Sequence, residues 1–284
     1  MRDGEDLALE ILGKAVVPLT YIGEDSWKFR PNPSVVLEFQ RSSGGEVTGY
    51  RIGDHEEFRF EPSADLPSAE EMAARVAQAH RLDLLESIGP LRLHSTLTME
   101  KLGMEGEVQT LLAWPGHFRY ESTVANQFER VAYNGEQVWY ESALKPLAAL
   151  DGKRAAFTRV DSPFARFGDW KRWYPSFEVV QELHRKGRKV ILVRMGNCSA
   201  PATTLYVDAE TGRMIHTDGM AEVEGMGTIG QRVSYGDFRD VSGVLLPYRS
   251  EVEIANPLIG TIATRVTEVE VGVELAEGVF ELSD

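Results

Sequence analysis

The stretch TTLYVDAETGRMIHTD, from Thr203 to Asp218, decides how the rest of this chain is interpreted. Its carboxylates, histidine and hydroxyls would suit an active site, but the same residue types suit a polar β-hairpin. Leu205 and Val207 share one face of a first strand, and Met214 and His216 share one face of a return strand. This alternation favours two antiparallel strands.

The residues between these two strands are of the types that a turn requires. Gly212 can adopt the left-handed conformation that ends a four- or five-residue loop. Asp208 and Glu210 could ligate Ca²⁺, but a calcium loop needs more oxygen ligands than these carboxylates supply, with a glycine at a fixed offset. We therefore predict a hairpin at the rim of a sheet, with Asp208, Glu210 and Gly212 in its loop.

The acidic composition of the chain limits its partners. Of the 284 residues, 30 are Lys or Arg and 44 are Asp or Glu, so the formal net charge is −14. Phosphate backbones are bound through clustered Lys and Arg, and we expect no nucleic-acid partner. The hydrophobic fraction of 43% is ordinary for a folded chain, which is long enough for one large all-β domain or two smaller ones.

The single cysteine, Cys198, excludes an internal disulfide and a cysteine-rich zinc site. It lies in the loop MGNCSAPA, where an inert thiol is the default interpretation. No apolar run approaches the length of a transmembrane segment. The N-terminal MRDGEDLALEILG lacks the basic-then-apolar order of a signal peptide. Two alternatives stay open: the protein remains inside the cell, or it is exported and its signal has been removed.

Residues 1–65 are predicted to form a partial β-module of about five short strands. Val35, Leu37 and Phe39 share one face of a strand, as a period of two requires. The turn at Ser42-Ser43-Gly44-Gly45 supplies the positive φ angles that a hairpin needs. This number of short strands is too small to close a barrel.

A Pro- and Ser-rich segment then leads into a predicted helix over residues 68–88. Ser68 and Glu71 have the spacing of a capping box, in which each side chain accepts a hydrogen bond from the other residue's backbone N–H. Gly89 and Pro90 end the helix. From Leu91 onward β-hairpins dominate, with Asn134-Gly135 as a strong turn signal.

A helical insert at about residues 142–175 interrupts these hairpins. Ala143–Ala149 is a short helix candidate, and Pro163 suits a first helical position. In SPFARFGDWKRWYPSF, residues 162–177, aromatic residues recur every three positions and form one helical stripe. The stripe packs on the sheet as core, covers a hydrophobic cavity, or contacts a membrane interface.

Catalytic and cofactor motifs are missing from the sequence. There is no G-x-S-x-G nucleophile elbow and no P-loop. GMGTIG, residues 225–230, lies between strands with no following helix and is interpreted as a turn. None of the six histidines has zinc-ligand spacing. His216 and Asp218, on one strand face, are the best candidates for a metal-dependent hydrolase.

The order of these segments resembles the LolA/LolB-like, outer-membrane lipoprotein-sorting-like superfamily. The resemblance covers about residues 66–284 and is carried by LRLHSTLTMEKLGMEGEVQTLLAWPGHFRYES, AYNGEQVWY, DGKRAAF, TTLYVDAETGRM and VSYGDFRDVSGVLLPYR. It implies a mainly β fold, in which a large curved antiparallel sheet, an incomplete β-barrel, has helices over its concave face around an apolar cavity. It implies no catalytic residue.

The preceding segment, PLTYIGEDSWKFRPNPSVVLEFQRSSGGEVTGYRI, resembles the closing strands of a lipocalin-like β-module. Such modules are appended to secreted peptidases and β-lactamase-like hydrolases. This second resemblance implies that the chain is the C-terminal part of a larger exported protein, or a divergent relative of one.

Our leading hypothesis is therefore a non-enzymatic binding domain for a lipid, acyl chain or lipoprotein-like segment in an exported bacterial protein, periplasmic or extracellular. We expect no cofactor or metal, and expect another part of a larger exported protein as a second partner. The alternative is a structural accessory region of a larger secreted hydrolase, with a cavity filled by its own side chains. The predicted ligand contacts are Phe157, Phe164, Phe167, Trp170, Trp173, Trp139, Leu205 and Val207.

Overall fold

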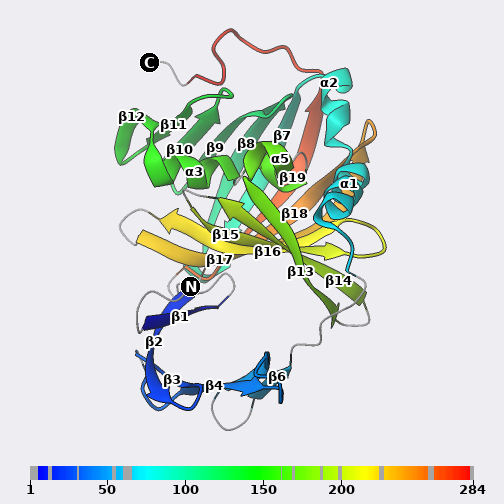
Figure 1. Cartoon of the computed structure of the whole chain (residues 1–284). Helices are drawn as coiled ribbons and strands as arrows, with labels where there is room; N and C mark the ends of the chain where they lie inside the picture. The colour runs from blue at the N-terminus through cyan, green and yellow to red at the C-terminus, as the bar shows by residue number, and fades with distance from the viewer. Residues whose placement is uncertain are drawn as a thin grey trace. The chain divides into compact units, whose positions relative to one another are not determined.

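The chain divides into two compact units, Met1–Asp65 and Leu66–Asp284, in a computed structural model (Figure 1). The structure describes residues 6–11, 15–30, 32–52, 56–59, 66–160, 162–167, 170–185, 188–197, 200–223, 227–254 and 259–281. Each unit has its own sheet and its own hydrophobic core.

The first unit is an antiparallel sheet in which successive strands are neighbours. Its described residues form six strands where the sequence predicted about five, because the segment DLALEI pairs with the strand that follows it. Leu19, Phe29 and Leu37 are its buried core. The likeness to a lipocalin-like module stays a prediction. The strands are β1 (Asp6–Ile11), β2 (Ala15–Gly23), β3 (Ser26–Phe29), β4 (Val36–Arg41), β5 (Val47–Ile52) and β6 (Glu56–Arg59).

The second unit is built on a large antiparallel sheet, as predicted, with thirteen strands in its described residues. The strand order is β12-β11-β10-β9-β8-β7-β19-β18-β17-β16-β15-β14-β13, so β12 and β13 are edges and the sheet does not close. The strands are β7 (Leu91–Met99), β8 (Met104–Ala113), β9 (His117–Val124), β10 (Gln127–Tyr133), β11 (Val138–Ser142), β12 (Lys145–Leu150), β13 (Ser176–Arg185), β14 (Arg188–Asn197), β15 (Ala200–Asp208), β16 (Met214–Val223), β17 (Gly227–Val241), β18 (Val244–Ile254) and β19 (Thr261–Val271).

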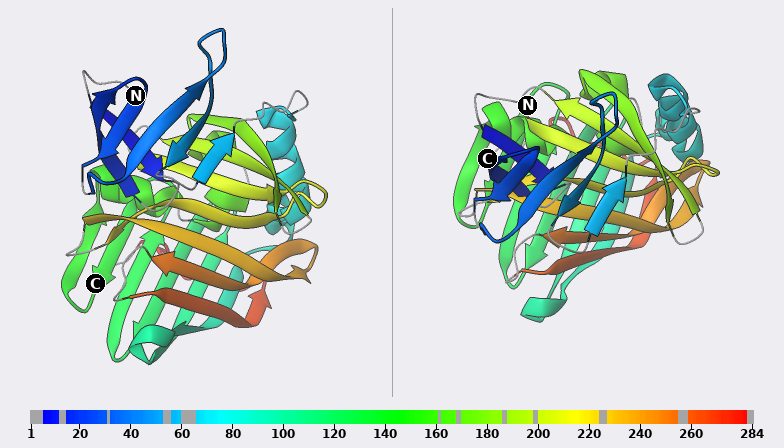
Figure 2. Two further views of the ribbon diagram at one scale, coloured as in Figure 1. Left: turned by 90° about the horizontal axis from the view of Figure 1, so that it is seen from below. Right: turned by 60° about the horizontal axis from the view of Figure 1, so that its bottom comes forward.

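This sheet consists of two meanders joined at a single seam. Strands β7 to β12 form one meander and β13 to β19 the other, and β7 pairs with β19 from Leu91↔Val271 to Met99↔Ile262. Figure 2 shows the orange-to-red strands at the end of the chain beside the cyan-green strands of the first meander. The seam thus joins the first and last strands of the sheet.

The prediction of one continuous helix over residues 68–88 is wrong, because the helix is interrupted at Arg81. The capping box is confirmed, since Ser68 N–H donates to Glu71 Oε2 at 2.7 Å and Glu71 N–H to Ser68 Oγ at 3.2 Å. However, Arg81 has a left-handed backbone with a φ of 50° and ends α1 (Ala69–His80). The chain continues as η1 (Leu82–Leu84) and α2 (Leu85–Ile88), because this break buries Leu82 and Leu85 in the core.

The insert before β13 is only partly helical. The predicted helix Ala143–Ala149 is wrong, because Lys145–Leu150 pairs with β11 as the edge strand β12. Ser142 Oγ accepts from the N–H groups of Leu144 and Lys145 and so stabilises a turn there. Three helices follow, α3 (Gly152–Val160), α4 (Pro163–Phe167) and α5 (Trp170–Trp173), so the aromatic stripe is divided between α4 and α5. In Figure 1, α3 and α5 lie over one face of β7–β10, called here the inner face.

The hairpin at Thr203–Asp218 is confirmed as β15 and β16. Asp208 Oδ1 accepts from the N–H groups of Glu210 and Thr211, and Gly212 is left-handed with a φ of 69°. The prediction that Met214 and His216 share one face of the return strand is wrong, because a bulge lies between them. Met214 packs in the main core, whereas His216 stacks on Tyr206 with ring centroids 3.9 Å apart.

Candidate ligand-binding cavity

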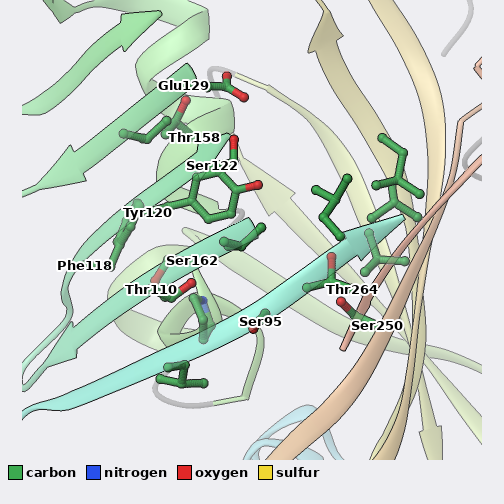
Figure 3. Close-up of a pocket in the computed structure, with 18 of the residues that line it drawn as sticks. Ser95, Thr110, Phe118, Tyr120, Ser122, Glu129, Thr158, Ser162, Ser250 and Thr264 are labelled. Atoms are coloured by element: carbon green, nitrogen blue, oxygen red, sulfur yellow. The ribbon is translucent and has the colours of Figure 1, made fainter. Parts of the chain in front are cut away.

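A cavity of about 700 Å³ lies between the inner face of the sheet and helices α3 and α4 (Figure 3). Its walls come from β7–β11 in the first meander, from β17–β19 in the second and from the two helices. This volume lies within the usual range for cavities that enclose a small molecule.

Much of the cavity wall is apolar. Along β7 the lining residues are Leu93, Ser95, Leu97 and Met99, because alternate side chains of a strand point to the same face. The same alternation places apolar residues of the neighbouring strands on the cavity wall: Val108, Leu112, Phe118, Val124, Val131, Val233, Leu246, Val252, Ile262 and Val266.

Polar groups cross the middle of this wall, over six adjacent strands. The strand pairing places Ser250 opposite Thr264, Thr110 opposite Tyr120, and Ser122 opposite Glu129. Ser95 on β7 lies between the first pair and the second in the order of strands. We call Ser250, Thr264, Ser95, Thr110, Tyr120, Ser122 and Glu129 the polar belt; all are labelled in Figure 3.

Electrostatics keep the Tyr120 hydroxyl of this belt neutral. Burial raises the pKa of Tyr120 above its ordinary value, and the nearby Glu129 carboxylate raises it further, while a hydrogen bond with Ser122 opposes the shift. A neutral phenol keeps its proton and can donate a hydrogen bond toward the cavity.

Two arginines of the helices contact aromatic residues of the sheet at the cavity wall. The Arg154 guanidinium of α3 lies 4.2 Å from the centroid of the Tyr140 ring on β11. Arg166 Nη1 of α4 donates to the Tyr235 hydroxyl on β17 at 2.7 Å. The Phe167 ring meets the same tyrosine edge to face at 5.0 Å. These contacts attach α3 and α4 to opposite walls of the cavity.

The structure places the predicted ligand contacts in three environments. Phe157 and Phe167 line the cavity. Phe164, Trp170, Leu205 and Val207 are at most 2% exposed and fill the core, and Trp173 packs against that core. Trp139 follows the opposite face of β11, since its neighbour Tyr140 lines the cavity. Whether any of the eight contacts a ligand stays a prediction.

The belt residues are among the wall residues that the sequence did not single out. Their signal is a small hydroxyl residue at an inward strand position among apolar ones, as Ser95 is between Leu93 and Leu97. A serine or threonine at such a position is also common on solvated strands, so only the pairing of distant strands shows that these residues share one wall.

The two candidate metal ligands, His216 and Asp218, contact other side chains. The Asp218 carboxylate is 2% exposed, and both of its oxygens accept from Arg232 at 2.6 Å. His216 stacks on Tyr206, as described above. In the described part of the chain, no three His, Cys, Asp or Glu side chains gather in a way that could hold a metal ion. Cys198 and His55 lie outside the described residues.

Comparison with solved structures assigns the fold. A LolA superfamily protein from Nitrosomonas europaea is similar over 76% of this chain and 98% of its own, with a TM-score of 0.53 and 11% identity. A putative outer membrane lipoprotein-sorting protein domain from Vibrio parahaemolyticus is similar over 74% and 97%, with a TM-score of 0.51 and 9% identity. The predicted LolA-like fold is thus confirmed. No protein-family model and no curated protein matches the sequence.

Proposed function

We propose that Leu66–Asp284 is a non-enzymatic binding domain for a hydrophobic ligand, a lipid, acyl chain or lipoprotein-like segment, in a protein exported to the periplasm or cell exterior. The observation that carries the proposal is the cavity of about 700 Å³ with its largely apolar wall. Phe157 and Phe167 are the sequence-predicted contacts that line it.

The cavity favours ligand binding over the accessory-region alternative. A purely structural domain would fill its interior with its own side chains to ordinary packing density. Here the aromatic residues of α4 and α5 do fill the core beside the cavity, yet a space of ligand size remains. The LolA-type fold of the two similar structures also supports the ligand-binding proposal, because one of them is described as a lipoprotein-sorting domain.

Other partner classes have less support. The net charge of −14 disfavours nucleic acid. Among the helices that the structure describes, none is both long and apolar enough to traverse a bilayer.

Blocking the cavity tests the proposal. Thr264→Trp places an indole on the cavity wall, and we expect Nile red, an apolar fluorescent dye, to bind at least about tenfold more weakly to this variant. Thr98→Trp is the matched control, since Thr98 is exposed on the neighbouring strand β7 and does not line the cavity.

Equal Nile red affinity of Thr264→Trp and the unmodified protein would contradict the proposal. Native mass spectrometry of the purified protein gives a second readout, in which a co-purified lipid is expected for the unmodified protein and for Thr98→Trp.

A further inference from the structure

The polar belt lies between two apolar ends of the cavity. Met99, Ile262 and Val252 lie at one end of the paired strands, and Leu112 and Phe118 at the other. The belt crosses β18, β19, β7, β8, β9 and β10, a width of about 24 Å at the usual spacing of strands. A ligand that fills the cavity therefore meets polar atoms in its middle, interspersed with apolar side chains such as Leu97 opposite Thr264 and Val108 opposite Ser95.

Four hydroxyls of the belt are available to a ligand. In the described part of the chain, the side chains of Ser95, Thr110, Ser250 and Thr264 make no hydrogen bond to another residue. Ser95 is only 8% exposed, so its hydroxyl faces the cavity and not the outer solvent. Covering such a group with hydrocarbon alone carries a desolvation cost, because the hydroxyl loses water and gains no partner.

The belt carries one charged residue among its hydroxyls. Its charged residue, Glu129, is a carboxylate directly opposite Ser122, and it would repel a second carboxylate or a phosphate. The two arginines at the wall, Arg154 and Arg166, remain cationic while they contact Tyr140 and Tyr235. The remaining belt groups are neutral hydroxyls, including the phenol of Tyr120, and such groups can donate to and accept from the hydroxyls of a ligand and donate to its ester carbonyls.

We infer that the cavity selects an amphiphile whose hydroxyl-bearing polar group lies at the belt and whose hydrocarbon lies at the apolar ends. Acylglycerols and acylated sugars carry such hydroxyls, whereas fatty acids and plain hydrocarbons do not. The inference rests on the proposed function, because it names the ligand class of the same cavity.

Lauroyl compounds with different heads test the inference through their displacement of Nile red from the whole chain. Glycerol monolaurate and methyl laurate share the acyl ester and differ in the glycerol hydroxyls. Lauric acid supplies the anionic head, and lauryl maltoside supplies a sugar. We expect glycerol monolaurate or lauryl maltoside to bind about tenfold more tightly than methyl laurate, which corresponds to one or two added hydrogen bonds. Whichever of the two binds more tightly identifies the head as glycerol or sugar.

The triple variant Thr110→Val, Ser250→Ala, Thr264→Val removes belt hydroxyls with little change of volume. We expect its preference for hydroxyl-bearing heads to fall to about twofold or less, while methyl laurate binds as tightly as before or more tightly. The control Thr96→Val, Thr98→Val removes hydroxyls from exposed positions of β7 and should keep the preference. Thr264→Val alone, with a smaller expected loss, serves if the triple variant fails to fold.

Three results would overturn the inference. Equal affinity for glycerol monolaurate, lauryl maltoside and methyl laurate in the unmodified protein is the first. Tighter binding of lauric acid than of the hydroxyl-bearing compounds is the second, and an unchanged preference in the folded belt variants is the third. In each case binding of methyl laurate would leave the proposed function standing. If neither Nile red nor any lauroyl compound binds, the proposed function fails as well.

Discussion

His80 is fully buried, and both of its ring nitrogens connect helix α1 to the sheet. Nδ1 donates to the carbonyl of Leu245 on β18 at 3.3 Å, and Nε2 accepts from the Met214 N–H on β16 at 3.2 Å. This pairing requires the neutral ring. Burial and, to a smaller extent, the positive charge of Arg213 lower the pKa of His80 to about 4, against the opposing effect of the hydrogen bond to Leu245.

We expect the protein to lose stability as the pH falls from about 6.5 to about 4, because in this range the unfolded chain takes up a proton at His80 and the folded chain does not. The loss should reach about 3 kcal/mol in the free energy of unfolding and then level off. Above about pH 6.5 both states are neutral at this residue, and it contributes no pH dependence.

Urea unfolding of the unmodified protein and of His80→Gln, measured across this pH range, tests the expectation. Gln keeps a donor and an acceptor but does not titrate, so the variant should show a shallower fall with pH. Parallel curves for the two proteins would assign the acid sensitivity to other groups.

At the scale of elements, the loop of the β15–β16 hairpin packs against α1. A Cβ atom on Gly212 would lie 2.7 Å from the Arg75 carbonyl oxygen and 3.2 Å from the Ala79 Cβ. Gly212 therefore meets two requirements, a left-handed backbone and close approach to a helix. Gly103, at the β7–β8 hairpin, has a similar φ of 61° but nothing within 4 Å of its Cβ position.

Alanine variants of these two glycines separate the energetic cost of backbone strain from the cost of contact with the helix. We expect Gly103→Ala to cost about 1 kcal/mol, which is the penalty of the left-handed backbone alone. Gly212→Ala should cost about 2 kcal/mol more, because the added methyl must displace α1 or the loop. Thermal unfolding of both variants measures the difference, and equal losses would show that the contact with α1 is readily relaxed.

Local features of these elements could be predicted from the sequence, and features set by distant partners could not. The capping box of Ser68 and Glu71 and the left-handed Gly212 depend on residues a few positions apart. The alanine-rich segment after Ser142 is a strand because β11 offers it a partner. The bulge that separates Met214 from His216 depends on pairing with β15.

At the scale of the whole molecule, the cavity was predictable only as a property of the resembled fold. Its wall combines Ser95 with Ser250 and Thr264, which are far away in the sequence and meet through the β7–β19 seam. The aromatic residues of α4 and α5 were conspicuous in the sequence, yet most of them fill the core. Prominent residues thus identified the covering helices, while ordinary ones form much of the cavity wall.

The seam between β7 and β19 also has a consequence for the time course of folding. Within each meander, neighbouring strands are joined by short connections, so these pairs close small loops. The seam instead closes a loop that contains nearly the entire second unit, and the entropy of that closure delays its formation. We therefore expect the two meanders to form first and the seam to join them later.

Strand β19 supplies its own internal control for this order of events. Between Ile262 and Arg265, where β19 pairs with both neighbours, its N–H groups point alternately to β18, within the same meander, and to β7, across the seam. In pulse-labelled hydrogen exchange during refolding, the amides directed to β18 should become protected before those directed to β7. Simultaneous protection along β19 would mean that the sheet forms in one step. The cavity would then form together with the sheet, with no earlier stage of two separate meanders.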